Sequence, residues 1–138
     1  MITIKKQEIV KLEDVLHLYQ AVGWTNYTHQ PEMLEQALSH SLVIYVALDG
    51  DAVVGLIRLV GDGFSSVFVQ DLIVLPSYQR QGIGSALMKE ALEYYKDAYQ
   101  VQLVTEETEK NVGFYRSMGF EILSTYNCIG MTWMNREK

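Results

Sequence analysis

A glycine-containing turn between a strand and a helix is the part of this sequence that points most clearly to a ligand-binding site. Residues 67–84 read VFVQDLIVLPSYQRQGIG, in which β-forming residues stop at Pro76 and Gln79–Gly84 leads into an amphipathic helix. A helix N-terminus leaves backbone N–H groups unpaired and carries partial positive charge. Glycine at 82 and 84 removes the Cβ atoms that would keep an anion from the backbone. The pattern predicts a site for a phosphorylated ligand, and its alternative is a turn that serves packing alone.

The spacing of this turn disfavours two common nucleotide-binding folds. Leu87 occupies the position of the third glycine in a G-x-G-x-x-G motif, which argues against a dinucleotide fold. No Gly-Lys-Ser/Thr follows the turn, which argues against a nucleoside-triphosphate P-loop. The phosphorylated ligand is therefore expected to be of another kind.

Composition predicts one globular domain over residues 1–138, since 49% hydrophobic and 20% charged residues are ordinary for a soluble protein. The net charge of −6 argues against nucleic-acid binding and weakly fits a cationic substrate. Cys128 is the single cysteine, which excludes an intramolecular disulfide and a cysteine-cluster zinc site. His17, His29 and His40 lack tight metal-ligand spacing, so no metal is expected.

Targeting signals are not evident in this sequence. The longest wholly apolar run, residues 42–48, is far too short to span a bilayer. The N-terminus, MITIKKQEI, contains no apolar segment of the kind that a secretion signal needs. We therefore expect a cytoplasmic protein with no membrane partner.

Hydrophobic periodicity predicts an α/β fold with a mixed sheet and helices on both faces. Asp49-Gly50-Asp51 marks a hairpin turn, and residues 67–105 form a strand-helix-strand crossover. Strands are expected at 2–5, 42–48, 52–60, 66–75, 101–105, 120–124 and 129–134, and helices at 12–22, from Pro31, at 83–96 and at 109–118.

A second motif makes the first far more specific. Residues 111–120 read Asn-Val-Gly-Phe-Tyr-Arg-Ser-Met-Gly-Phe, which by themselves also fit a core helix ending at Gly119. Gln-x-x-Gly-x-Gly on a strand-to-helix turn, followed after one more strand by Phe-Tyr-x-x-x-Gly-Phe, resembles the GCN5-related N-acetyltransferases, the GNAT family. The order of elements over almost the whole chain resembles that family too. The resemblance implies a GNAT-type acyl-CoA N-acyltransferase fold, α/β or α+β by scheme, with a mostly antiparallel sheet.

The resemblance implies acetyl-CoA as co-substrate. In this family the backbone N–H groups of the glycine turn hold the CoA pyrophosphate, and the pantetheine arm pairs with the central strand. The positions that match are Leu72, Ile73 and Val74 for the arm, and Arg80, Gln81, Gly82, Ile83, Gly84 and Ser85 for the pyrophosphate. Asn111 is a further candidate for cofactor binding, although many relatives carry their asparagine where this chain has Thr108.

Two residues are candidates for catalysis. Tyr115 matches the family tyrosine near the CoA sulfur, and a phenol with a pKa near ~10 can protonate a departing thiolate. A protonated amine must lose its proton before it attacks a thioester, and Asp71 is the candidate acceptor of that proton. Asp71 interrupts an apolar strand, where a carboxylate needs a partner or a function. Its alternative role is to bind backbone or a basic side chain and so organise the strand.

The acceptor pocket of this family usually lies between the first helical pair and the terminal strands. This comparison assigns Trp24, Tyr27, His29 and Trp133 to substrate binding. The aromatic residues could equally pack in the core or at a dimer interface. The motifs also resemble the glucosamine-phosphate N-acetyltransferase branch, but Trp133 and Met134 stand where that branch has an arginine, and Arg136 is displaced from it. A small aromatic or aliphatic amine is thus at least as good a candidate as a phosphosugar.

The sequence therefore predicts an N-acetyltransferase that transfers the acetyl group directly to a primary amine of a small molecule. Two alternatives stay open: a non-catalytic acyl-CoA sensor, and an enzyme that acetylates a protein or peptide. A homodimer is a further expectation, because the aromatic C-terminal strand could pair along its edge with another chain.

Overall fold

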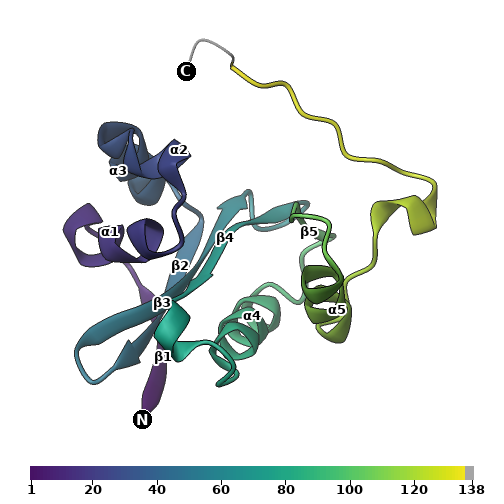
Figure 1. Cartoon of the computed structure of the whole chain (residues 1–138). Helices are drawn as coiled ribbons and strands as arrows, with labels where there is room; N and C mark the ends of the chain where they lie inside the picture. Colours follow the sequence, from purple (N-terminus) through teal and green to yellow (C-terminus); the bar gives the residue numbers. More distant parts are fainter. Residues whose placement is uncertain (136–138) are drawn as a thin grey trace. The chain divides into compact units, whose positions relative to one another are not determined.

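A mixed five-stranded sheet is the frame of the first part of the chain (Figure 1). The computed structural model describes residues 1–135, and the chain divides into two units, Met1–Val104 and Thr105–Lys138. In the first unit the strands lie in the order β1-β2-β3-β4-β5, antiparallel except for β4 and β5, which are parallel. Their bounds are β1 Ile2–Gln7, β2 Val43–Asp49, β3 Ala52–Gly61, β4 Val67–Val74 and β5 Val101–Leu103.

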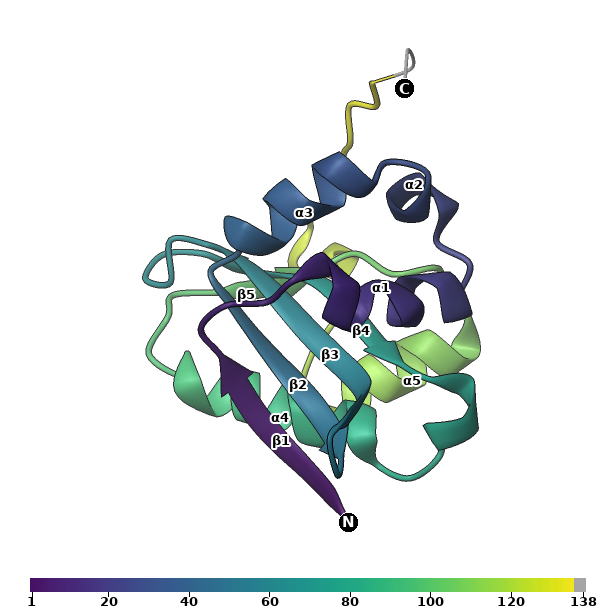
Figure 2. The same cartoon turned by 90° about the vertical axis from the view of Figure 1, so that its left-hand side faces the viewer.

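Helices cover both faces of this sheet, as the hydrophobic pattern predicts (Figure 2). One face carries α1 Leu12–Ala21, α2 Thr25–Thr28 and α3 Pro31–Ser39, and the other carries α4 Ile83–Tyr94. The four-residue helix α2 was not expected, because so short a segment shows no helical periodicity. The core between the sheet and the first three helices consists of Val15, Leu18, Tyr19, Tyr27, Leu34, Leu38, Ile44, Val46, Leu56 and Ile73.

The opposite face is closed by α4, which buries Ile83, Leu87, Met88 and Ala91. Gly55 of β3 lies under this helix, and a Cβ atom there would stand 3.4 Å from Leu87 Cδ1 and 2.9 Å from the Ile73 carbonyl oxygen. The missing side chain thus lets β3, β4 and α4 approach one another closely. Burial of the Leu87 side chain stabilises the fold by about 1.5–3 kcal/mol.

A β-bulge interrupts the pairing of β3 with β4. Arg58 pairs with Asp71 and Leu59 pairs with Val69, so Gln70 is the extra residue on β4. A bulge bends its strand and changes the direction of the side chains around it. The bulge lies next to the last point of contact with β5, which pairs with β4 only over residues 67–69.

The second unit contains one α-helix, α5 Glu109–Ser117, and a short 3₁₀ turn at Leu123–Tyr126 among its described residues. Thr108 caps α5 by accepting a hydrogen bond from the Asn111 backbone N–H at 3.1 Å. The strands expected at 120–124 and 129–134 are wrong, since neither range is in a strand. A period-two pattern shows that a segment suits a half-buried sheet surface, but a strand also needs a neighbour for its backbone.

Within residues 1–135, no helix has the length and the apolar character that crossing a membrane requires. Arg136, which is displaced from the position of the arginine in the glucosamine-phosphate branch, lies outside the described residues.

Candidate active site

Hydrogen bonds to the end of β2 and to β3 hold the segment that leads into the glycine turn. A 3₁₀ turn, Pro76–Tyr78, follows β4, and the Tyr78 hydroxyl donates a hydrogen bond to Asp49 Oδ2 at 2.6 Å. The Leu75 backbone N–H donates to the Val54 carbonyl oxygen of β3 at 2.9 Å. These bonds hold the start of the turn, so the helix that follows begins at a defined place beside the sheet.

Gly82 caps α4 in a left-handed conformation, with φ of 77°. No side chain caps this helix, and the first helical bond is donated by Ala86 N–H to the Gly82 carbonyl oxygen at 3.0 Å. The N–H groups of the preceding first turn therefore have no acceptor within the helix. A Cβ atom on Gly82 would meet nothing within 4 Å, so the space over the turn is open. This arrangement suits a phosphate group.

The expected pyrophosphate residues all lie in this turn. Gly82 and Ile83 begin α4, Gly84 and Ser85 continue its first turn, and Arg80 and Gln81 precede it with exposed side chains. Arg80 has φ of 66°, which is uncommon for a residue with a side chain. The turn thus contains two left-handed residues, Arg80 and Gly82, directly before the helix.

The last residues of β4 have one edge that no described strand pairs with. β5 leaves β4 after Val69, so residues 70–74 pair only with β3. Backbone polar groups alternate in direction along a strand. The Leu75 N–H and the Ile73 carbonyl point toward β3, so the backbone groups of Leu72 and Val74 point to the opposite edge. The Val74 carbonyl accepts a hydrogen bond from Gln79 Nε2 at 3.1 Å, which agrees with this direction.

Asp71 is the centre of a buried network of hydrogen bonds. Arg58 Nε donates to Asp71 Oδ2 at 2.7 Å, and the Tyr19 hydroxyl donates to the same oxygen at 2.8 Å. The Tyr27 hydroxyl donates to Oδ1 at 3.0 Å. Only 4% of Arg58 and 2% of Asp71 is exposed. Three donors thus satisfy both oxygens of this buried carboxylate.

The network joins three helices to the two central strands. Arg58 Nη1 donates to Ser41 Oγ, just after α3, at 3.2 Å, and Arg58 Nη2 lies 3.2 Å from the Tyr27 hydroxyl oxygen of α2. Gln70 Nε2 also donates to the Tyr27 hydroxyl, at 3.3 Å. Consecutive strand residues normally face opposite sides, and the bulge allows Gln70 and Asp71 both to reach Tyr27.

The tyrosines of this network are held in the protonated state. Burial and the Asp71 charge raise the pKa of Tyr19 and of Tyr27 above the usual tyrosine value. Both phenols therefore remain donors to the carboxylate at any physiological pH. Of the two roles expected for Asp71, this geometry favours the organising one, because the carboxylate already accepts three hydrogen bonds.

The residues expected at the acceptor pocket have different surroundings. Tyr27 is 8% exposed and belongs to the buried network, and the Trp24 ring lies 6.2 Å from the Tyr19 ring and 6.3 Å from the Tyr27 ring. His29 follows α2 and is exposed. Trp133, in the second unit, is also exposed. The structure thus brings Trp24 and Tyr27 together with Asp71, and His29 is not part of this cluster.

Tyr115 and Asn111 lie on α5 in the second unit. The Tyr115 ring packs edge-to-face with Phe114 at 5.0 Å and with Phe120 at 6.0 Å between centroids. Burial raises the pKa of Tyr115, and a hydrogen bond with the Thr105 side chain opposes that shift. The phenol is therefore a proton donor at neutral pH. Asn111 Nδ2 donates to the Glu106 carbonyl oxygen at 3.1 Å, which stabilises the start of α5.

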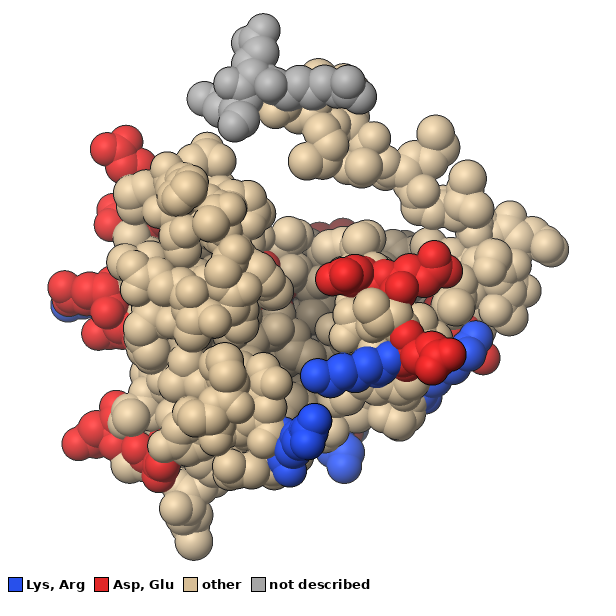
Figure 3. Space-filling view, in the orientation of Figure 1, with Lys and Arg blue, Asp and Glu red and all other residues tan. Residues whose placement is uncertain are grey.

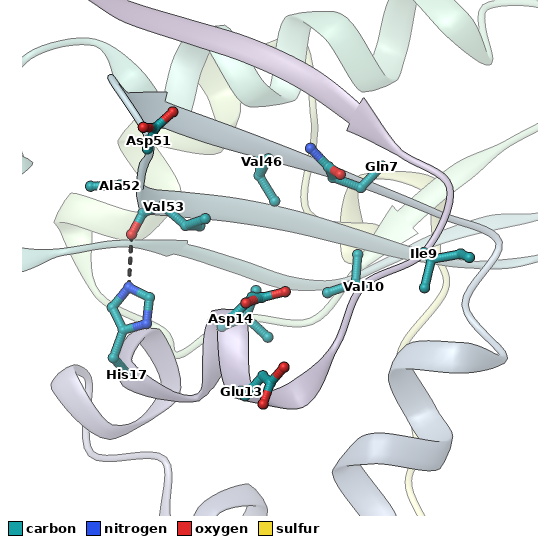
Figure 4. Close-up of a pocket in the computed structure, with 11 residues that line it drawn as sticks. Gln7, Ile9, Val10, Glu13, Asp14, His17, Val46, Asp51, Ala52 and Val53 are labelled. Carbon is teal, nitrogen blue, oxygen red and sulfur yellow. Dashed lines mark hydrogen bonds between the residues drawn. The ribbon is translucent and has the colours of Figure 1, made fainter.

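A cavity of about 470 Å³ lies between α1 and the sheet of the first unit (Figure 4). Figure 4 shows Val46 and Val53 on the sheet side, and His17 of α1 bonded to the Val53 carbonyl oxygen at 2.8 Å. Glu13 and Asp14 lie on the helix side. None of the residues that the two motifs single out lines this cavity, so it is separate from the predicted site.

Arg58, Tyr19 and Gln70 of the buried network were not expected from the sequence. Arg58 stands in the apolar run of β3, and it shows the same signal that singled out Asp71 on β4. Because each of these two neighbouring apolar strands contains one charged residue, and the charges are opposite, the sequence could have predicted that Arg58 and Asp71 form an ion pair. Tyr19 and Gln70 show no comparable signal, because a tyrosine in a helix and a glutamine in a strand are both common.

Comparisons with known proteins found a matching family model and similar structures. A family model described as an acetyltransferase (GNAT) domain matches residues 40–122. The GNAT family acetyltransferase SP0256 from Streptococcus pneumoniae TIGR4 is similar in structure, with a TM-score of 0.91 and 88% identity over 99% of both chains. A PaiA N-acetyltransferase from Thermoplasma acidophilum in complex with coenzyme A shares the fold, with a TM-score of 0.67 and 19% identity, over 87% of this chain and 91% of that one.

A relative in rice is similar in sequence. The chloroplastic serotonin N-acetyltransferase 2 of Oryza sativa subsp. japonica is 32% identical over 95 residues. The match includes 66% of this chain and 48% of the rice protein, so this chain spans about half the length of that relative.

We expect Asp71→Ala to lower the free energy of unfolding by about 3–5 kcal/mol, because it leaves the Arg58 guanidinium buried without its partner. The double variant Arg58→Met/Asp71→Leu removes both charges and is expected to lose less stability than the single variant. Urea denaturation measures both values. If Asp71→Ala keeps full stability and loses only turnover, then Asp71 acts in proton transfer and not in organising the fold.

We expect Gly82→Ala to weaken the binding of acetyl-CoA at least tenfold, because a Cβ would occupy the open space over the turn and strain its backbone. Gly23→Ala is the matched control, since Gly23 has φ of 70° and nothing within 4 Å of its Cβ position. Both variants should lose similar stability, about 1 kcal/mol, from the left-handed conformation. Isothermal titration calorimetry measures the affinity of each variant for acetyl-CoA. Equal affinities in the two variants would show that the glycine turn is not part of the binding site.

Proposed function

Because the chain belongs to the GNAT family of acetyltransferases, we propose that it transfers the acetyl group of acetyl-CoA to a primary amine of a small molecule. The observations that carry this proposal are the N-terminus of α4 at Gly82, which no side chain caps, and the edge of β4 that β5 leaves unpaired after Val69. The family model spans residues 40–122, which include parts of both units. This span supports a single acetyltransferase domain over the chain.

Acetyl-CoA supplies an activated acetyl thioester and a negatively charged pyrophosphate. We assign the pyrophosphate to the backbone N–H groups of the turn from Arg80 to Ser85. The exposed Arg80 side chain adds positive charge beside them. We assign the pantetheine amides to the open β4 edge, where the backbone groups of Leu72 and Val74 can pair with an extended ligand. Ile73 contributes through its buried side chain, which holds β4 on the core.

Direct transfer needs no covalent intermediate with the protein. The neutral amine nitrogen attacks the thioester carbonyl carbon, the carbon–sulfur bond breaks, the CoA thiolate leaves, and the nitrogen loses one of its own protons to water as it becomes the amide nitrogen. Tyr115 is the proposed donor of a proton to that thiolate, because burial raises the pKa of its phenol and keeps it protonated at neutral pH, and it regains a proton from solvent afterwards. We assign the acceptance of the ammonium proton to water, because the Asp71 oxygens already accept hydrogen bonds from Arg58 and two tyrosines.

Charge and aromatic surface support an amine as the acceptor. Acidic side chains gather along the margin formed by α1 and α3, where Glu13, Asp14, Glu32 and Glu35 are exposed (Figure 3). A negative potential raises the local concentration of a protonated amine. The partly exposed Trp24 beside Tyr27 supplies an aromatic surface for a small organic substrate.

The test of this function is amine-dependent release of CoA thiol from acetyl-CoA. The panel contains aromatic amines, polyamines, amino sugars, aminoglycosides and short peptides, and a calorimetric titration with acetyl-CoA serves as its control. We expect binding of acetyl-CoA and release with at least one small amine. Release with peptides alone would assign a protein substrate, and binding without any release would assign a sensor.

We expect Tyr115→Phe to lower kcat by at least tenfold and to leave the affinity for acetyl-CoA nearly unchanged, because the phenol acts only on the departing thiolate. Steady-state kinetics with the best amine of the panel measures kcat, and calorimetry measures affinity. Tyr126→Phe is the control, since that tyrosine is exposed in the same unit. An equal loss of turnover and affinity, or no loss of either, would show that Tyr115 does not protonate the departing thiolate.

A further inference from the structure

The cavity between α1 and the sheet has the size of a ligand site, and the site proposed for acetyl-CoA uses none of its residues. Its volume of about 470 Å³ falls within the range of about 300–1,000 Å³ that is usual for small-molecule sites. Every residue that lines it belongs to the first unit. The cavity is therefore complete within that unit.

The floor of this cavity is apolar. Val15 of α1 and Val46 of β2 are 1% and 2% exposed, and both belong to the hydrophobic core. Val10 and Val53 pack against the same core, and Figure 4 shows Val10, Val46 and Val53 around the cavity. Contact with such a floor removes apolar surface of a ligand from water, which favours binding.

The rim of the cavity is acidic. Glu13 and Asp14 lie in the first turn of α1, and Asp51 lies at the turn between β2 and β3 (Figure 4). No lysine or arginine lines the cavity. Within residues 1–135, none of these three carboxylates takes part in an ion pair. Their negative charge is thus available to a ligand.

A hydrogen bond holds the two walls of the cavity together. His17 lies three positions after Asp14 on α1, and its Nε2 lies 2.8 Å from the Val53 carbonyl oxygen of β3. A carbonyl oxygen only accepts hydrogen bonds, so His17 Nε2 is the donor. The bond keeps α1 and β3 in place beside the cavity before any ligand arrives. A preformed site loses less conformational freedom on binding than one that must first become ordered.

We propose that this cavity binds a small organic cation, an amine with an aliphatic body, at a site separate from that of acetyl-CoA. The carboxylates of two different elements attract the ammonium group, and the valine floor contacts the aliphatic body. An anion would be repelled by three carboxylates. A metal ion does not fit either, because no group of three His, Cys, Asp or Glu side chains in the described chain could hold one.

A bound amine would contact α1 and the sheet at the same time. The same helix contributes Tyr19 to the buried network around Asp71, so the ligand stabilises the position of α1 on which that network depends. Binding to the folded state alone also raises the stability of the protein. The proposal rests on the cavity and its carboxylates, so its failure would leave the assignment of acetyl transfer unaffected.

The experiment is a titration of the full chain followed by the NMR shifts of its backbone amides, without acetyl-CoA. Its three ligands share one aliphatic body and differ in charge: hexylamine, hexan-1-ol and hexanoate. We expect saturable shifts with hexylamine at residues 10–17, 46 and 51–53, and an affinity about tenfold higher than for either other ligand. The midpoint of thermal unfolding should rise with the concentration of hexylamine.

Two double variants test the carboxylates. We expect Asp14→Asn/Asp51→Asn to weaken the binding of hexylamine by about fivefold or more, because two of its attracting charges are removed. Glu32→Gln/Glu35→Gln is the matched control, since it removes the same charge from exposed positions of α3 that do not line the cavity. Circular dichroism checks that both variants are folded.

Four results would overturn the proposal. These are no saturable binding of hexylamine, equal affinity for the three ligands, shifts confined to residues outside the cavity, and an equal loss of affinity in the two double variants. The last result would show that the amine responds to the overall negative charge of the protein and not to this cavity.

Discussion

The buried ion pair between Arg58 and Asp71 is the interaction on which the arrangement of the first unit depends. Both groups are almost completely removed from water, and the separation of 2.7 Å between Arg58 Nε and Asp71 Oδ2 allows a direct charge-assisted hydrogen bond. Desolvation of two charges is expensive, and it is offset here by two phenol donors and by Ser41 as a further partner of the guanidinium. Within the described chain, no buried side-chain nitrogen or oxygen of this unit lacks a hydrogen-bond partner.

This pair gives the helical layer one position on the sheet. Apolar packing alone tolerates small shifts of α1 and α2, because hydrophobic contacts have no preferred direction. Hydrogen bonds from Tyr19 and Tyr27 to one carboxylate do have a direction, so they place both helices over the centre of β4. The aromatic cluster that Trp24 forms with these tyrosines is positioned through the same bonds.

The bulge at Gln70 connects this pair to the open edge of β4. One extra residue places Asp71 opposite Arg58 and bends the strand just where β5 ends its pairing. Past that point the edge has no strand partner among the described residues, and the chain continues into the glycine turn that begins α4. The β-bulge at Gln70 thus lies at the point where β4 contributes Asp71 to the buried network and where its other edge becomes available to an extended cofactor.

The sequence by itself determined the features that depend on neighbouring residues. The glycine turn, the hairpin at Gly50 and the helix after Gly82 were all predictable, because capping, turn conformation and amphipathic periodicity are local. Only the tertiary structure decided the partners of Asp71, which lie 13 positions away at Arg58 and 52 positions away at Tyr19. It also decided that residues 129–134, in spite of their alternating pattern, form no strand. Both outcomes have the same physical reason: a buried charge and a strand are completed by groups distant in the chain, and local sequence does not specify which groups these are.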